Sequence, residues 1–147
     1  MAPKAPNELD NHAGERIVFL QTARDTDGAL LEFDAYLDPG APGPPRHVHL
    51  HQEERFQVLG GTMRVSMGDL ETVLEEGGEA AISPGTPHTW GNAGGSNLQA
   101  RVRLTPAVGF EDFLRRSFAL MADKEGVLDV EALEPLLAEF EDQYRLA

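Results

Sequence analysis

The sequence predicts an all-β domain, either a sandwich or a barrel, followed by two C-terminal α-helices. Short apolar segments separated by clusters of Gly, Pro, Asn and Asp fill residues 15–105, which is typical of closely spaced strands and turns. Within residues 30–37, apolar and polar side chains alternate, as expected for a strand with one face in the core. After Pro106, apolar residues recur three and four positions apart, which is the spacing of a helix.

The chain divides into three predicted regions. Residues 1–14, rich in Pro, Asn and Ala, are expected to form a flexible N-terminal arm. Residues 15–105 form the predicted β-barrel, and residues 106–147 form a helical extension packed on it. Predicted strands cover residues 16–23, 30–37, 56–59, 63–67, 70–74, 79–83, 86–90 and 98–104. The Pro- and Gly-rich residues 38–45 predict an irregular loop that leads into a further strand starting at His47.

Two amphipathic helices are predicted in the C-terminal region. The first carries its apolar residues at Phe110, Phe113, Leu114 and Phe118. The second follows Asp129, a residue type favoured at helix N-caps, and its apolar stripe consists of Leu133, Leu136, Leu137 and Phe140. These helices are expected to cover the β-domain and not to form a separate domain.

Composition limits the classes of partner and of metal ligand. The 147 residues contain 12 Lys and Arg and 25 Asp and Glu, and the formal charge of −13 argues against nucleic acids and anionic membranes. The absence of cysteine excludes disulfides and thiolate metal sites, so any metal must be held by nitrogen and oxygen. No apolar run approaches the length of about 18 residues needed to span a membrane, and the N-terminus lacks the apolar core of a signal peptide. We therefore expect a soluble cytoplasmic protein.

A cluster of histidines suggests a metal site. His47, His49 and His51 occupy every second position, so on a strand they would share one face. Imidazole and carboxylate groups suit Zn, Cu, Fe or Ni, and a distant histidine, His88, could complete the set. The alternative is that these residues form a solvated polar strand face.

The two histidine segments resemble the two motifs of the cupin family. The first motif, His-x-His, four residues, Glu, six residues and Gly, matches His47, His49, Glu54 and Gly61. In the second segment, Gly85, His88 and Asn92 match the family pattern. Two positions depart from it: Ala41 replaces the opening Gly of the first motif, and Ser83 replaces the leading Pro of the second.

The resemblance implies a double-stranded β-helix, or jelly-roll, barrel with one divalent transition metal ion inside each chain. The metal would be Fe, Cu, Ni, Mn or Zn, and its implied ligands are His47, His49, Glu54 and His88. Glu53 is the alternative carboxylate, but Glu54 shares a strand face with the predicted interior positions. The resemblance, together with the outward-facing Val48 and Leu50, also implies a homodimer.

Several side chains are candidates for lining a substrate pocket beside the metal. For most of these residues, plain core packing explains the sequence equally well, and His51 is more simply a solvated histidine at the rim. The candidate pocket residues are His51, Phe33, Phe56, Met63, Val65 and Trp90.

The family resemblance implies a small-molecule substrate or ligand, and the chain resembles quercetinase-like cupins. The expected activity is therefore that of a metal-dependent dioxygenase acting on a small enolic or phenolic substrate, with Glu54 as a catalytic general base. One alternative is a zinc-dependent isomerase or cyclase, in which the metal stabilises an enolate. A third is a non-catalytic cupin that binds a small molecule.

Overall fold

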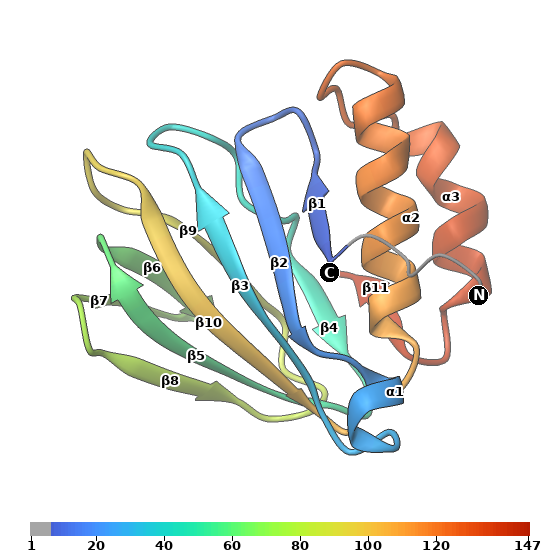
Figure 1. Cartoon of the computed structure of the whole chain (residues 1–147), viewed down its shortest axis with the longest axis horizontal. Coiled ribbons are helices and arrows are strands. Elements are labelled where there is room, and N and C mark those ends of the chain that lie inside the picture. Colours follow the sequence, from blue (N-terminus) through green and yellow to red (C-terminus); the bar gives the residue numbers. More distant parts are fainter. Residues whose placement is uncertain (1–6) are drawn as a thin grey trace.

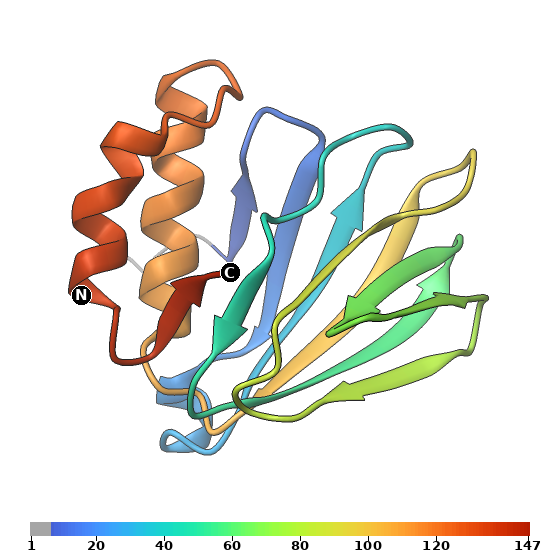
Figure 2. The same cartoon turned by 180° about the vertical axis from the view of Figure 1, so that it is seen from behind.

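The computed structural model describes residues 7–147 and contains two antiparallel β-sheets packed against each other. Figures 1 and 2 show two helices standing side by side at one end of the sheets, next to the short strands β1 (Glu8–Asp10) and β4 (His47–His49). The predicted fold class, a jelly-roll β-domain with two C-terminal helices, is confirmed.

Six strands form the larger sheet. Their order across the sheet is β1 (Glu8–Asp10), β2 (Glu15–Gln21), β3 (Leu31–Leu37), β10 (Leu98–Thr105), β5 (Glu53–Gly60) and β8 (Glu79–Ile82). The sequence analysis placed residues 8–10 in the N-terminal arm, whereas here they pair with β2, with Leu9 opposite Ile17. A short helix, α1 (Ala23–Thr26), lies between β2 and β3, where the sequence predicted the end of a strand and a turn.

Five strands form the smaller sheet. Their order is β11 (Tyr144–Leu146), β4 (His47–His49), β9 (His88–Asn92), β6 (Met63–Met67) and β7 (Leu70–Leu74). Strand β4 therefore lies between two strands that are distant in sequence. It pairs with β9 through His47 and His88, and with the C-terminal β11 on its other edge.

The prediction of a closed barrel was wrong in one respect, because the two sheets remain separate. In the described part of the chain, no backbone pairing links an edge strand of one sheet to an edge strand of the other. At the helical end, the space between the sheets is filled by side chains of α2 (Phe110–Asp123). Phe110, Phe113 and Phe118 of this helix are buried in the same core as the strands, so a helix covers the side where a barrel would close.

The alternating pattern of β3 explains how the core is built. Leu31, Phe33, Ala35 and Leu37 are all buried and face the smaller sheet's side of the core. The polar residues between them are also largely buried, contrary to the half-buried strand expected from alternation. Arginines of the neighbouring strand β10 cover these acidic residues through the ion pairs Arg101–Asp34 and Arg103–Glu32.

The C-terminal helices pack beside the sheets and return the chain to them. Helix α3 (Val130–Glu139) begins after Asp129, whose side chain accepts a hydrogen bond from the Ala132 N–H at 3.3 Å. The chain then enters β11, which places Tyr144 opposite His49. No helix in the described residues is long and apolar enough to cross a membrane.

Gly43 allows the loop before β4 to approach β9 closely. A Cβ atom at this position would collide with the backbone carbonyl of Trp90, so alanine cannot fit without displacing the loop. We expect Gly43→Ala to lower the free energy of unfolding by about 1–3 kcal/mol, as overpacking usually does. Urea denaturation would measure this change. Gly95→Ala is the control, because a Cβ at Gly95 meets no neighbouring atom within 4 Å.

Candidate metal centre

Four side chains from three strands converge inside the protein. One ligand atom from each of His47, His49, Glu54 and His88 can be chosen so that all four lie within 4.8 Å of one another. Their exposed fractions are only 3, 2, 4 and 1%, respectively. The cluster is therefore closed off from bulk solvent, and its residue types are those that bind divalent transition metals.

Strand geometry explains why these residues meet. His47 and His49 are two positions apart on β4 and therefore project from the same face. His88 starts β9 directly opposite His47, and Glu54 enters from β5 in the facing sheet. Glu53 points the other way and forms an ion pair with Arg55 at 2.7 Å, so Glu54 supplies the carboxylate of the cluster.

Two of the histidines are oriented by backbone carbonyl groups. The Nδ1 atom of His47 lies 2.7 Å from the carbonyl oxygen of Pro45, and that of His88 lies 2.9 Å from the carbonyl oxygen of Thr86. A carbonyl oxygen only accepts hydrogen bonds, so each Nδ1 must carry the proton that it donates. The Nε2 atoms of both rings are thereby directed toward the cluster.

The third histidine is oriented by Gln52, a buried residue that the sequence analysis missed. The Gln52 amide nitrogen donates to the carbonyl oxygens of Pro106 and Ala107, at 2.8 and 2.7 Å. Its amide oxygen therefore faces the Nδ1 atom of His49, at 3.1 Å, and accepts a hydrogen bond from it. Strand alternation could have revealed Gln52. It lies two residues before Glu54, so in an extended chain both side chains point inward.

The Nε2 atom of His49 is buried and lacks a hydrogen-bond partner in the described structure. Because Nδ1 holds the proton, Nε2 presents its lone pair to the cluster, 3.7 Å from a carboxylate oxygen of Glu54. An unsatisfied buried acceptor costs free energy unless something binds it. The donor set of three imidazoles and one carboxylate therefore fits a divalent metal ion.

The charges of the cluster depend on one another. Burial, together with the nearby His88 and His49, lowers the pKa of His47 to about 3, and burial also lowers the pKa of His49. Burial alone would raise the pKa of Glu54, but the adjacent histidines lower it on balance. Despite burial, the 2.7 Å hydrogen bond to Glu54 raises the pKa of His88, which favours an imidazolium in the metal-free protein. A bound metal ion would take the place of that proton.

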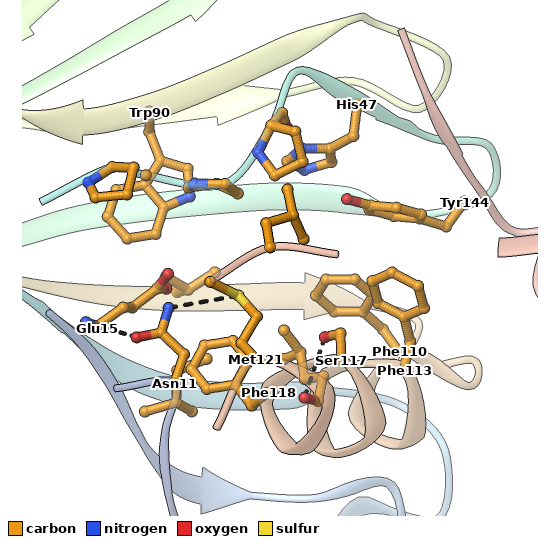
Figure 3. A pocket seen from close by; sticks show the side chains of 18 of the residues that line it. Asn11, Glu15, His47, Trp90, Phe110, Phe113, Ser117, Phe118, Met121 and Tyr144 are labelled. Atoms are coloured by element: carbon orange, nitrogen blue, oxygen red, sulfur yellow. Dashed lines mark hydrogen bonds between the residues drawn. The ribbon is translucent and has the colours of Figure 1, made fainter. Parts of the chain in front are cut away.

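A cavity of about 220 Å³ adjoins the cluster, and His47 and Glu54 form part of its wall. Figure 3 shows the ring of Tyr144 next to His47, with Phe110 and Phe113 of α2 below it. The rings of His47 and Tyr144 are stacked with their centroids 5.0 Å apart. Most of the remaining wall is apolar, so the cavity suits a small, largely apolar molecule.

The predicted pocket residues separate into three groups. Phe33 and Trp90 line the cavity. Phe56, Met63 and Val65 are buried but do not line it, because they pack deeper in the core. His51 is exposed and lies away from the cavity, since β4 ends at His49 and strand alternation stops there.

Other wall residues come from segments that the sequence did not connect with the site. Tyr144, Phe110 and Phe113 belong to the C-terminal region, and Asn11 and Glu15 lie near the N-terminus. No local pattern marks these residues as parts of one site, because only tertiary packing brings β2, α2 and β11 to the same cavity.

We expect Gln52→Leu to weaken metal binding about 10–100-fold, the usual effect of losing the residue that orients a ligand. The substitution frees the His49 ring to rotate and removes the hydrogen-bond donor of the Pro106 and Ala107 carbonyl oxygens. Competition with a chromophoric chelator would measure the affinity. Gln57→Leu is the control, because Gln57 lies on the opposite face of β5. Unchanged affinity in Gln52→Leu would show that Gln52 does not orient His49.

Comparison with known families identifies the domain. Residues 33–102 match the family described as the cupin domain, and this segment contains all four residues of the cluster. The chain therefore contains a cupin domain and has the cupin fold, as the two sequence motifs predicted. The closer likeness to quercetinases stays a prediction.

Curated relatives of the matched segment are described as oxidoreductases. A protein from Arthrobotrys oligospora, described as an oxidoreductase, is 38% identical over 63 residues, which amount to 42% of this chain. The matched segment is only 25% of that protein, so the chain spans about a quarter of the length of the relative.

Solved structures share the fold at low sequence identity. A sugar phosphate isomerase of the cupin superfamily from Silicibacter pomeroyi aligns with a TM-score of 0.56 and 22% identity, over 65% of this chain and 61% of that chain. Oxalate decarboxylase from Lactobacillus farciminis aligns with a TM-score of 0.56 and 15% identity, over 65% and 30% of the two chains. At these identities the comparisons establish the fold alone.

Proposed function

We propose that this cupin is a metal-dependent dioxygenase that acts on a small enolic or phenolic substrate. The observation that carries this proposal is a buried cluster of three histidines and one glutamate that adjoins an apolar cavity through His47 and Glu54. The resemblance to an oxidoreductase over the matched segment supports a redox reaction. The structural likeness to oxalate decarboxylase is compatible with a catalytic role for this fold.

The proposed ligands are the Nε2 atoms of His47, His49 and His88 and the carboxylate of Glu54. A divalent ion held there would leave a net positive charge of about one, which stabilises an enolate or phenolate oxygen. Glu54 borders the cavity, so its carboxylate can take the hydroxyl proton of a substrate bound there. The aromatic wall of Phe110, Phe113 and Tyr144 would exclude water and hold a flat ring.

Oxygen consumption tests the proposed reaction. The metal-free protein would be loaded separately with iron, copper, nickel or manganese and mixed with flavonols, catechols and β-diketones at an oxygen electrode. We expect one metal to support oxygen uptake in proportion to substrate consumed, and His49→Ala to abolish it. If no combination exceeds the rate of free metal in solution, the dioxygenase assignment is wrong.

The second candidate is a zinc-dependent isomerase or cyclase. It is consistent with the fold that the chain shares with the Silicibacter pomeroyi isomerase. The cavity wall argues against a sugar phosphate as substrate, because the residues between 7 and 147 that line it include neither Lys nor Arg. A neutral enolisable compound would suit it better. Isomerisation by the zinc-loaded protein without oxygen uptake would favour this candidate. Tight binding with no turnover would favour a non-catalytic binding protein.

A homodimer is also part of the proposal. Strand β7 is an edge strand that exposes Leu70 and Val73, at 61 and 54%, and apolar edges of this kind are commonly covered by a partner. Light scattering coupled to size-exclusion chromatography would give the mass. A single chain mass of 16.0 kDa at micromolar concentration would contradict the dimer.

A further inference from the structure

Glu15 is a buried acidic residue that the proposed chemistry does not use. It starts β2, where Ile17 and Phe19 face the core at the next two alternate positions, so its side chain also points inward. Only 6% of Glu15 is exposed, and it lines the cavity. Figure 3 shows Glu15 beside Asn11, on the other side of the cavity from Tyr144.

The carboxyl group of Glu15 has no partner in the described part of the chain. No side-chain hydrogen bond or ion pair of the described residues reaches it. The Glu15 backbone, by contrast, is bonded: its N–H donates to the Asn11 side-chain oxygen at 3.1 Å, and its carbonyl oxygen accepts from the Asn11 backbone N–H at 3.1 Å. The neighbouring Arg16 points outward and pairs with Glu8 at 2.9 Å. An unpaired buried carboxyl group destabilises a protein, so its presence calls for another explanation.

Two other buried acids of the same sheet provide a contrast. Asp34 and Glu32 on β3 are as deeply buried as Glu15, but each forms an ion pair with an arginine of β10. Those carboxylates are satisfied within the sheet and face away from the cavity. The unpaired state of Glu15 is therefore a feature of the cavity wall and not of the sheet in general.

Burial raises the pKa of Glu15 to about 8, so the group is mostly neutral at neutral pH. A neutral carboxyl group can donate one hydrogen bond and accept others. Beside it, the Asn11 side-chain nitrogen has, among the described residues, only the sulfur of Met121 as a hydrogen-bond partner, at 3.9 Å, and sulfur is a weak acceptor. This end of the cavity thus offers hydrogen-bond donors in otherwise apolar surroundings.

We propose that Glu15 is a specificity-determining residue that hydrogen-bonds a second oxygen of the substrate, distant from the oxygen that binds at the histidine cluster. The substrate class is then an aromatic or otherwise flat apolar molecule that carries one enolic or phenolic oxygen at one end and a hydroxyl or carbonyl oxygen at the other. This inference rests on the proposed function, because it assumes that one end of the substrate binds at the cluster. Asn11 would support the same contact.

Anaerobic ligand binding tests the inference without requiring catalysis. The probes are 3-hydroxyflavone and three derivatives, each with one additional hydroxyl group on the ring far from the metal-binding oxygens. Affinity for zinc-loaded protein would be measured by fluorescence. We expect at least one derivative to bind about tenfold more tightly than 3-hydroxyflavone, as a hydrogen bond to a buried polar group allows.

Substitutions at Glu15 then identify the source of the preference. Glu15→Leu should abolish the tighter binding of the hydroxylated derivative relative to 3-hydroxyflavone. Glu15→Gln should keep most of this difference, because its amide can still donate a hydrogen bond. Ser117→Ala is the control, because the Ser117 hydroxyl lines the cavity but already donates to the Leu114 carbonyl at 3.2 Å. We expect the metal content of all three variants to equal that of the parent protein.

Three results would overturn the inference. They are an unchanged preference in Glu15→Leu, the absence of any preference in the parent protein, and the failure of all four probes to bind. Glu15→Leu and Glu15→Met should melt at or above the temperature of the parent, because each removes an unpaired buried carboxyl group. Unfolding of both would instead show a structural role. If a hydroxylated probe binds more tightly in a Glu15-dependent way but no oxygen is consumed, this inference is supported and only the dioxygenase proposal is contradicted.

Discussion

Replacing His49 by alanine is expected to remove nearly all bound metal, with a loss of affinity greater than about 100-fold. Loss of an orienting residue alone usually costs 10–100-fold, and loss of a ligand should cost more. The Nε2 atom of His49 is buried and has no hydrogen-bond partner among residues 7–147, so its lone pair is free to bind a metal ion. Elemental analysis and chelator competition would measure the effect.

The fold should survive this change. Truncation to alanine leaves a void next to Phe110 and Tyr144, but it also removes a polar atom that is unsatisfied without metal. Circular dichroism should therefore match that of the parent protein. His51→Ala is the matched control, since His51 is two residues away and exposed. If His49→Ala binds metal as tightly as His51→Ala, His49 is not a ligand.

Glu54→Gln is expected to have the second-largest effect. The substitution keeps the shape of the side chain but removes the only negative charge among the four converging residues. Metal affinity should fall by about 100-fold or more, because a buried cation loses its charge partner. Oxygen uptake should fall below detection, since the proposed base is lost together with the metal.

The same variant has a second readout in the metal-free protein. The hydrogen bond to Glu54 raises the pKa of His88, so removing the carboxylate should lower that pKa toward or below the ordinary value for histidine. Titration of the histidine ring signals by nuclear magnetic resonance would detect the shift. Glu53→Gln is the control, because Glu53 pairs with Arg55 outside the cluster. Equal effects of the two substitutions would contradict the assignment of Glu54.

The cluster was accessible to sequence reasoning because it depends on local rules. Side chains alternate between the two faces of a strand, which placed His47 and His49 on one face. The same rule favoured Glu54 over Glu53, because Glu54 shares a face with the interior positions of its strand. His88 was a candidate to complete the set, the family resemblance implied that it is a ligand, and the structure places it directly opposite His47. His51 shows where the rule stops, since alternation holds only as far as the strand extends.

The cavity could not be derived in the same way. Its walls combine Glu15 of β2 with Tyr144 of β11, which line the same cavity because the C-terminal region folds back beside β4. Strand alternation also could not show that α2 fills the gap between the two sheets where a barrel would close. The position of α2 depends on how its phenylalanines pack in the core. The strands that carry the histidine and glutamate cluster were therefore predictable, whereas the shape and polarity of the adjoining cavity were not.

The most direct test of a metal-dependent cupin is elemental analysis of the protein purified without added metal, at known protein concentration. We predict about one transition metal ion per chain, bound by the His47, His49, Glu54 and His88 cluster. Iron, copper, nickel or manganese would support the dioxygenase, and zinc would favour the isomerase or cyclase. Protein that contains no metal and takes up none from any of these five salts would contradict the account.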